Sequence, residues 1–184
     1  MSMITDETIC AEMLVHVPMC THQDPKKILV ISSETQISTE LARYDEISYE
    51  VISQNFLQEL EKKQDESFDL VIVYADETVD TVFVAQINRV LNAKGLFVCK
   101  TNVKKELMMA CTHLFGIVMP YKYTKTKSFD EVVLASKLYH PTADILLQRS
   151  DLLEGVSYYN TEVHLGSFAL PNFERKELAG IYKQ

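Results

Sequence analysis

Two adjacent carboxylates, Asp76 and Glu77, follow the apolar run at residues 68–73 and are the clearest candidates for chemistry in this chain. Carboxylates at the end of a buried strand could hold a cationic amine and accept its proton. The same pair could equally cap a helix that begins near Val79, because acidic residues are favoured at helix N-termini. The residues alone leave both interpretations open.

The turn after the first predicted strand is a second candidate site. Residues 28–31 are four consecutive aliphatics, which is typical of a strand buried on both faces inside a parallel sheet. Ligands of such sheets bind beyond the carboxyl ends of the strands, and nucleotides usually lie against a glycine-rich turn. Here the turn holds Ser32, Ser33 and Glu34, and residues 32–36 contain no glycine.

Strands and helices alternate along most of the chain. Hydrophobic spacing predicts strands over 27–31, 47–52, 68–73 and 96–100, and helices over 8–19, 37–44, 55–63, 82–91 and 104–114. Residues 92–95 end in Gly95 and read as a helix stop. Two further strands, 117–123 and 131–138, predict an antiparallel hairpin, with helical pieces around 142–153 and 171–181. This order predicts an α/β, methyltransferase-like (Rossmann-like) fold, with a mostly parallel sheet, helices on both faces and a C-terminal antiparallel hairpin.

Composition limits the function classes. The 184 residues carry a formal net charge of −8 with a pI near 5.1, which argues against a nucleic-acid partner. No long apolar run and no signal-peptide pattern is present, so we expect no membrane partner. The four cysteines are scattered without metal-ligand or disulfide spacing, which favours reduced thiols and a cytoplasmic location; they are Cys10, Cys20, Cys99 and Cys111.

Two windows at opposite ends of the chain carry a family pattern. The first holds Thr5-Asp6-Glu7, Glu12-Met13, Pro18, Thr21-His22 and Pro25-Lys26-Lys27-Ile28-Leu29-Val30-Ile31. The second holds Tyr158-Tyr159-Asn160, His164 and Phe168-Ala169-Leu170-Pro171-Asn172-Phe173. They look like the D-E-x-x-Y-x-E-M helix before H-x-x-P-K-x-V-L-I-I, and the Y-Y-N-x-x-x-H-x-x-x-F-x-L-P-x-F signature. In these windows the chain resembles the spermidine synthases, which are polyamine aminopropyltransferases.

The resemblance implies a function and a set of site residues. The family transfers an aminopropyl group from decarboxylated S-adenosylmethionine to putrescine, with no metal and no tightly bound cofactor. The resemblance also implies a homodimer. It also implies one domain over residues 1–184, with a lead-in helix in 1–26 and the sheet with its covering helices in 27–184. The implied catalytic residues are Asp76, Glu77 and Tyr159; the co-substrate would meet Ser32, Ser33, Glu34 and Gln54, and the amine would meet Tyr158 and Tyr74.

The chain also departs from the family pattern. The family's G-G-G-D-G turn falls on residues 32–36, where Cβ atoms penalise left-handed backbone by roughly 1–2 kcal/mol per residue. Between Ser33 and Ser67 there is room for one βα unit where the family has two. If residues 49–53 match the family's third strand, the second strand is deleted with its ribose-binding acid. Losing that contact costs about 1.5–3 kcal/mol, or roughly ten- to a hundredfold in affinity.

Further departures affect the amine side of the site. The first aspartate of the family's D-S-x-D stretch has become Tyr74, and Cys10 and Ala11 replace a tyrosine and its polar neighbour. The family's N-terminal β-domain has no counterpart before Thr5. Tyrosines such as Tyr158 and Tyr159 could instead pack under a C-terminal helix, and a structural role is expected for His164.

Three functions follow from these residues. The first is a divergent aminopropyltransferase, which the family resemblance favours. The second is a catalytically degenerate homologue, a pseudoenzyme that acts as a binding or interaction protein, which the residues favour. The third is an S-adenosylmethionine-dependent methyltransferase, against which the missing glycine turn and ribose acid count equally.

Overall fold

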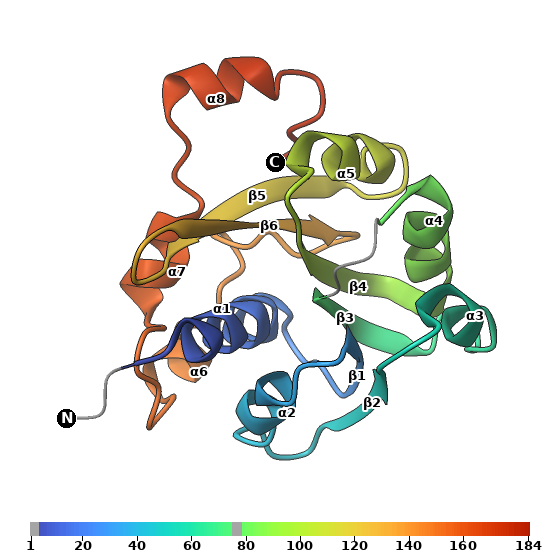
Figure 1. The fold of residues 1–184 in the computed structure, drawn as a ribbon, viewed down its shortest axis with the longest axis horizontal. Helices are drawn as coiled ribbons and strands as arrows, with labels where there is room; N and C mark the ends of the chain where they lie inside the picture. Colours follow the sequence, from blue (N-terminus) through green and yellow to red (C-terminus); the bar gives the residue numbers. More distant parts are fainter. Residues whose placement is uncertain (1–3, 75–78) are drawn as a thin grey trace.

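A computed structural model describes residues 4–74 and 79–184 and shows one sheet with helices on both faces (Figure 1). The strands are β1 (Lys27–Ser32), β2 (Ser48–Ile52), β3 (Phe68–Tyr74), β4 (Leu91–Lys100), β5 (Ile117–Thr124) and β6 (Phe129–Ser136). The helices are α1 (Asp6–Thr21), α2 (Gln36–Leu41), α3 (Phe56–Glu61), α4 (Thr81–Val90), α5 (Lys104–Cys111), α6 (Leu147–Asp151), α7 (Thr161–Ser167) and α8 (Asn172–Glu177).

The described strands form a six-stranded sheet in the order β2-β1-β3-β4-β6-β5. Four strands run parallel, because β1 pairs with β2 and β3, and β3 pairs with β4. The hairpin of β5 and β6 is antiparallel, and β6 joins it to β4. The predicted α/β fold with a mostly parallel sheet and a C-terminal antiparallel hairpin is therefore confirmed.

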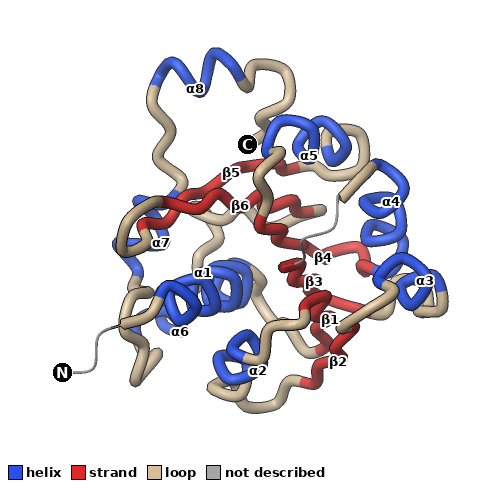
Figure 2. Tube along the Cα trace, viewed as in Figure 1, coloured by secondary structure: helices blue, strands red, loops and turns tan. Residues whose placement is uncertain are grey.

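Alternation along the strands sends side chains to two separate cores. Ile28 and Val30 face the layer of α1 and α2, whereas Leu29 and Ile31 face the layer of α3, α4 and α5. Figure 2 shows these two helical layers on opposite sides of the strands. Burial on both faces explains why β1 has no polar alternation, as its continuous aliphatic run predicts.

Among the described strands, β2 alone lies on the outer side of β1. The edge strand β2 lies directly beside β1, in register from Lys27–Ser48 to Ile31–Ile52. In doubly wound sheets with the order 3-2-1-4, the neighbour of the first strand is the second strand along the chain. Here β2 occupies the place beside β1. A single strand on this side would pair with β1 whichever family strand was lost, so the match of residues 49–53 to the family's third strand stays a prediction.

One predicted boundary is also corrected. Gly95 does not stop α4, because the helix ends at Val90 and its C-cap Leu91 already has extended backbone. Gly95 lies inside β4. A Cβ atom there would stand 2.8 Å from Leu91 Cδ2 and 2.9 Å from Leu91 Cβ, so glycine is needed for close packing where the register between β3 and β4 shifts.

Helix α4 begins with a conventional cap. The carboxylate of Asp80 accepts a hydrogen bond from the Phe83 amide at 2.9 Å, and Asp80 is the N-cap residue. Asp80 thus supplies the N-cap of α4, whereas Asp76 and Glu77, for which capping was one of two alternatives, lie outside the described residues. Across the described residues, no helix combines the length and apolar character needed to cross a membrane.

Candidate functional site at the strand tips

Three parallel strands end side by side and place Ser32, Tyr74 and Lys100 together. Ser32 pairs with Tyr74 in the register of β1 and β3, and Lys100 follows the Val73–Cys99 pair of β3 and β4. This is the edge at which ligands of parallel α/β sheets bind. We call these strand ends, with the adjoining residues of α1 and β6, the strand-tip site.

The turn after β1 contains an internal hydrogen bond between Ser32 and Glu34. Ser32 is buried, and its Oγ accepts the Glu34 amide hydrogen at 2.9 Å, which occupies a donor that could otherwise face a ligand. Ser33 and Glu34 are exposed. A described cavity beside them has a volume of about 10 Å³, and it is lined by Glu7, Ala11, Glu34, Gln36, Ile37 and Tyr74. A space of about 10–15 Å³ accommodates roughly one water molecule.

Lys100 forms the main electrostatic contact at the strand tips. Its Nζ lies 4.4 Å from the centroid of the Tyr74 ring and donates to Tyr74 Oη at 3.5 Å. It also pairs with Asp130 Oδ2 on β6 at 3.4 Å. Tyr123 donates to the same oxygen at 3.1 Å, and Lys125 pairs with Asp130 Oδ1 at 3.0 Å.

The pKa shifts of the strand-tip groups follow from burial and from these contacts. Burial acts to lower the pKa of Lys100, but Tyr74 and Asp130 outweigh it and leave that pKa above its ordinary value. Burial raises the pKa of Tyr74, with the Cys10 thiol adding to the effect. Burial also raises the pKa of Cys10. At neutral pH the site therefore holds a lysine ammonium beside a neutral phenol and a neutral thiol.

The two sequence windows meet through one buried carboxylate. Glu12 of α1 is 1% exposed, and it accepts three backbone N–H bonds, each 2.8 Å long. Ser157 donates to Oε1, and Tyr158 and Tyr159 donate to Oε2. The acidic residue of the first window thus anchors the tyrosine pair of the second.

Tyr159 is buried in the core between α1, α6 and α7. Its hydroxyl contacts His164 Nδ1 at 2.8 Å and accepts a hydrogen bond from Ser150 Oγ at 3.2 Å. His164 Nε2 lies 2.9 Å from the Pro141 carbonyl, so Nε2 carries the proton and the tyrosine donates to Nδ1. His164 is thus fully satisfied, in the structural role expected for it. Burial raises the pKa of Tyr159 and lowers the pKa of His164 to about 4.

The remaining predicted site residues are dispersed. Tyr158 is half-buried, and its hydroxyl accepts the Thr124 amide hydrogen at 2.9 Å. Gln54 is exposed after β2, at the carboxyl end of the strand beside β1. Asp76 and Glu77 lie outside the described residues. The described part of the site brings together Ser32, Glu34 and Tyr74, whereas Tyr159 belongs to the packed core.

Sequence reasoning missed Lys100, Asp130 and the anchoring role of Glu12. Lys100 had a usable signal, because it ends a predicted strand whose neighbours carry candidate site residues at their own ends. Asp130 had no local signal, because it reaches the site only through the pairing of β6 with β4.

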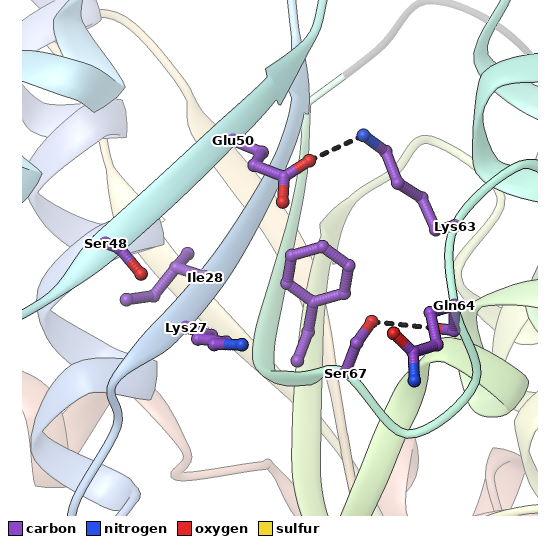
Figure 3. Close-up of a pocket in the computed structure, with 8 residues that line it drawn as sticks. Lys27, Ile28, Ser48, Glu50, Lys63, Gln64 and Ser67 are labelled. Carbon is purple, nitrogen blue, oxygen red and sulfur yellow. Dashed lines mark hydrogen bonds and ion pairs between the residues drawn. The ribbon is translucent and has the colours of Figure 1, made fainter.

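A separate hollow lies at the other ends of the strands (Figure 3). Its volume is about 200 Å³, and it lies near the amino ends of β1, β2 and β3, lined by Lys27, Ile28, Ser48, Glu50, Lys63, Gln64, Ser67 and Phe68. Glu50 and Lys63 form an ion pair of 2.6 Å across it. In residues 4–74 and 79–184, no three His, Cys, Asp or Glu side chains are grouped to hold a metal ion.

Comparison with known proteins gives consistent matches. The polyamine aminopropyltransferase of Clostridium beijerinckii is 27% identical over 228 residues, covering 96% of this chain and 80% of the relative. The spermidine synthase structure from Thermotoga maritima superposes with a TM-score of 0.84 at 25% identity, covering 94% of this chain and 75% of that one. A methyltransferase structure from Archaeoglobus fulgidus has a TM-score of 0.59 at 10% identity and shares the fold. No family model matches the chain.

The sheet order and the strand-tip site define a Rossmann-like protein of the methyltransferase fold class. The relatives narrow this class, because they match both ends of the chain at once. These matches support a divergent member of the spermidine synthase family. The 228-residue alignment with the Clostridium enzyme is longer than this 184-residue chain, so part of the relative's aligned region has no counterpart here.

Proposed function

We propose that this protein keeps the spermidine synthase scaffold but transfers an aminopropyl group from decarboxylated S-adenosylmethionine to putrescine weakly or not at all. It would then serve as a degenerate homologue that binds or interacts with a partner. We further propose that it works as a homodimer, that it is cytoplasmic and that it holds no tightly bound cofactor.

The turn after β1 carries this proposal. Nucleoside-sized ligands need pockets of about 300–1,000 Å³, whereas the described cavity beside Glu34 measures about 10 Å³. The Ser32 hydroxyl bonds the Glu34 amide, so that donor does not face a ligand. Residues 32–36 also lack the glycines that would let a ligand approach the backbone closely.

Transfer chemistry needs an uncharged attacking amine and a base. The amine nitrogen attacks the carbon next to the sulfonium, that carbon–sulfur bond breaks, and the amine proton passes to a carboxylate. At the strand tips, the Lys100 ammonium lies between Tyr74 and Asp130, where its charge would repel an incoming diamine. This arrangement supports reduced transfer.

A second candidate is an active aminopropyltransferase, and α4 favours it. Because Asp80 caps that helix, Asp76 and Glu77 are not required as its N-cap. In this candidate the two acids would hold the amine and accept its proton, with Tyr74 and Tyr158 beside it, whereas Tyr159 would stay in the core. The TM-score of 0.84 to a spermidine synthase supports it as well.

A product assay separates the two candidates. The purified chain is incubated with decarboxylated S-adenosylmethionine and putrescine, and spermidine and methylthioadenosine are measured by mass spectrometry. The Thermotoga maritima spermidine synthase serves as the positive control. We expect a rate roughly a hundredfold or more below that control. The two charge-assisted contacts proposed to be lost are those of the ribose-binding acid and of the aspartate replaced by Tyr74, and each loss costs about ten- to a hundredfold. A comparable rate that falls in Asp76→Asn and Glu77→Gln would establish the second candidate instead.

A further inference from the structure

We infer that Lys100 occupies an ammonium-binding seat formed by Tyr74 and Asp130, so the protein's own side chain fills a site that would accept a small primary alkylammonium. The inference rests on the proposed function, because it identifies what now fills the amine side of the strand-tip site. The two side chains that form the seat lie on β3 and β6, and Lys100 reaches them from β4.

The geometry is that of a bound cation. Lys100 Nζ lies 4.4 Å from the Tyr74 ring centroid, well within the distance of about 6 Å at which cations are attracted to aromatic faces. Its charge is balanced by Asp130 Oδ2 at 3.4 Å, and Tyr74 Oη accepts a hydrogen bond at 3.5 Å. A ring face together with a carboxylate provides the two kinds of group that recognise an ammonium.

Neighbouring groups hold the carboxylate in place without needing Lys100. Tyr123 donates to Asp130 Oδ2 at 3.1 Å, and Lys125 pairs with Oδ1 at 3.0 Å. Tyr123 is 2% exposed and Asp130 has a side chain that is 15% exposed, so both are fixed by packing. Removing the Lys100 chain would therefore leave the seat formed and vacant.

Two other lysines with similar contacts differ from Lys100 in the aromatic ring. Lys104 pairs with Glu131 at 2.7 Å and has a side chain 18% exposed, close to the 21% of Lys100, but no aromatic contact is found for it among the described residues. Lys122 pairs with Glu131 at 3.3 Å and also lies 5.4 Å from the Phe129 centroid, but that ring is 60% exposed. Lys104 is thus a matched control for burial and ion pairing without a ring.

The test is chemical rescue of Lys100→Ala. This substitution removes Cγ, Cδ, Cε and Nζ, which are the heavy atoms of n-propylammonium. Thermal unfolding is followed by circular dichroism with increasing n-propylammonium chloride. A ligand at ten times its dissociation constant should raise the unfolding midpoint of a chain this size by about 3 to 6 °C. We expect that shift for Lys100→Ala, and no shift for the unsubstituted protein or for Lys104→Ala.

Two comparisons assign the shift to the seat. n-Propanol, which lacks the charge, should leave the midpoint of Lys100→Ala unchanged. Adding Tyr74→Leu should abolish the rescue, whereas Tyr74→Phe, which keeps the ring face, should preserve it. Should Lys100→Ala be unfolded without ligand, n-propylammonium should restore its far-ultraviolet signal.

The contrary outcomes are equally clear. Equal midpoints of Lys100→Ala with and without n-propylammonium would overturn the inference, as would an equal shift in Lys104→Ala. The experiment measures stability and needs no nucleoside. If the unsubstituted protein made spermidine while Lys100→Ala was still rescued, the proposed function would fail and the ammonium seat would stand.

Discussion

Replacing Glu12 by alanine should destabilise the protein strongly, because this single carboxylate joins the two ends of the chain. It accepts three backbone N–H bonds of 2.8 Å from the segment that carries the tyrosine pair. A hydrogen bond to a charged group contributes about 1.5–3 kcal/mol, and each buried donor left unpaired costs about 1–3 kcal/mol. Water can reach the part-buried Ser157 and Tyr158 amides, so we take the lower end of each range.

The expected loss for Glu12→Ala is therefore about 3–5 kcal/mol, a large share of the 5–15 kcal/mol typical of a whole domain. Glu12→Gln should cost less, because its amide oxygen still accepts two N–H bonds while its NH₂ group meets a third donor. Urea unfolding followed by circular dichroism measures both values. Glu177→Ala, an exposed site on α8, should change stability by less than about 0.5 kcal/mol. A Glu12→Ala variant as stable as Glu177→Ala would refute the anchoring role.

Three further outcomes are expected. Tyr159→Phe should lower the free energy of unfolding by about 1–2 kcal/mol, because it removes bonds to His164 and Ser150; a loss of ligand binding with unchanged stability would argue for a channel role instead. The pKa of His164 is lowered to about 4 by burial, so below pH 6.5 the unfolded chain binds the proton that the native state excludes. Stability should then fall by up to about 2 kcal/mol between pH 7 and pH 5 on its account, and His164→Gln should show a shallower pH dependence in urea unfolding, whereas identical slopes would contradict this. Asp80→Ala should cost about 0.5–2 kcal/mol through loss of the α4 cap, measured against the exposed Glu177→Ala; no loss would mean that the cap lies elsewhere.

The sheet was predictable because its strands are short runs of aliphatic residues. Residues 28–31 and 70–73 are continuous aliphatic runs that need burial on both faces, and a central strand of a parallel sheet covered by helices provides it. The position of β2 was not predictable from its own residues. Four of its five residues are exposed, so hydrophobic pattern could not assign it to the second or the third place in the sheet.

The candidate site was predictable only where its residues end strands. Ser32 and Tyr74 meet at the expected edge because parallel strands finish together. Tyr159 does not end a strand. Its hydroxyl bonds His164 within the core, in agreement with the alternative that the tyrosines pack under a C-terminal helix. Lys100 and Asp130 come together through long-range pairing of β4 with β6, which no local pattern encodes.

The proposed loss of the nucleoside-binding turn after β1 is tested most directly by calorimetric titration of the purified chain with methylthioadenosine. The Thermotoga maritima spermidine synthase serves as the positive control. Because Ser32 bonds the Glu34 amide and the adjacent described cavity measures about 10 Å³, we expect no heat of binding up to millimolar nucleoside. Saturable binding at micromolar concentration would contradict the proposed loss.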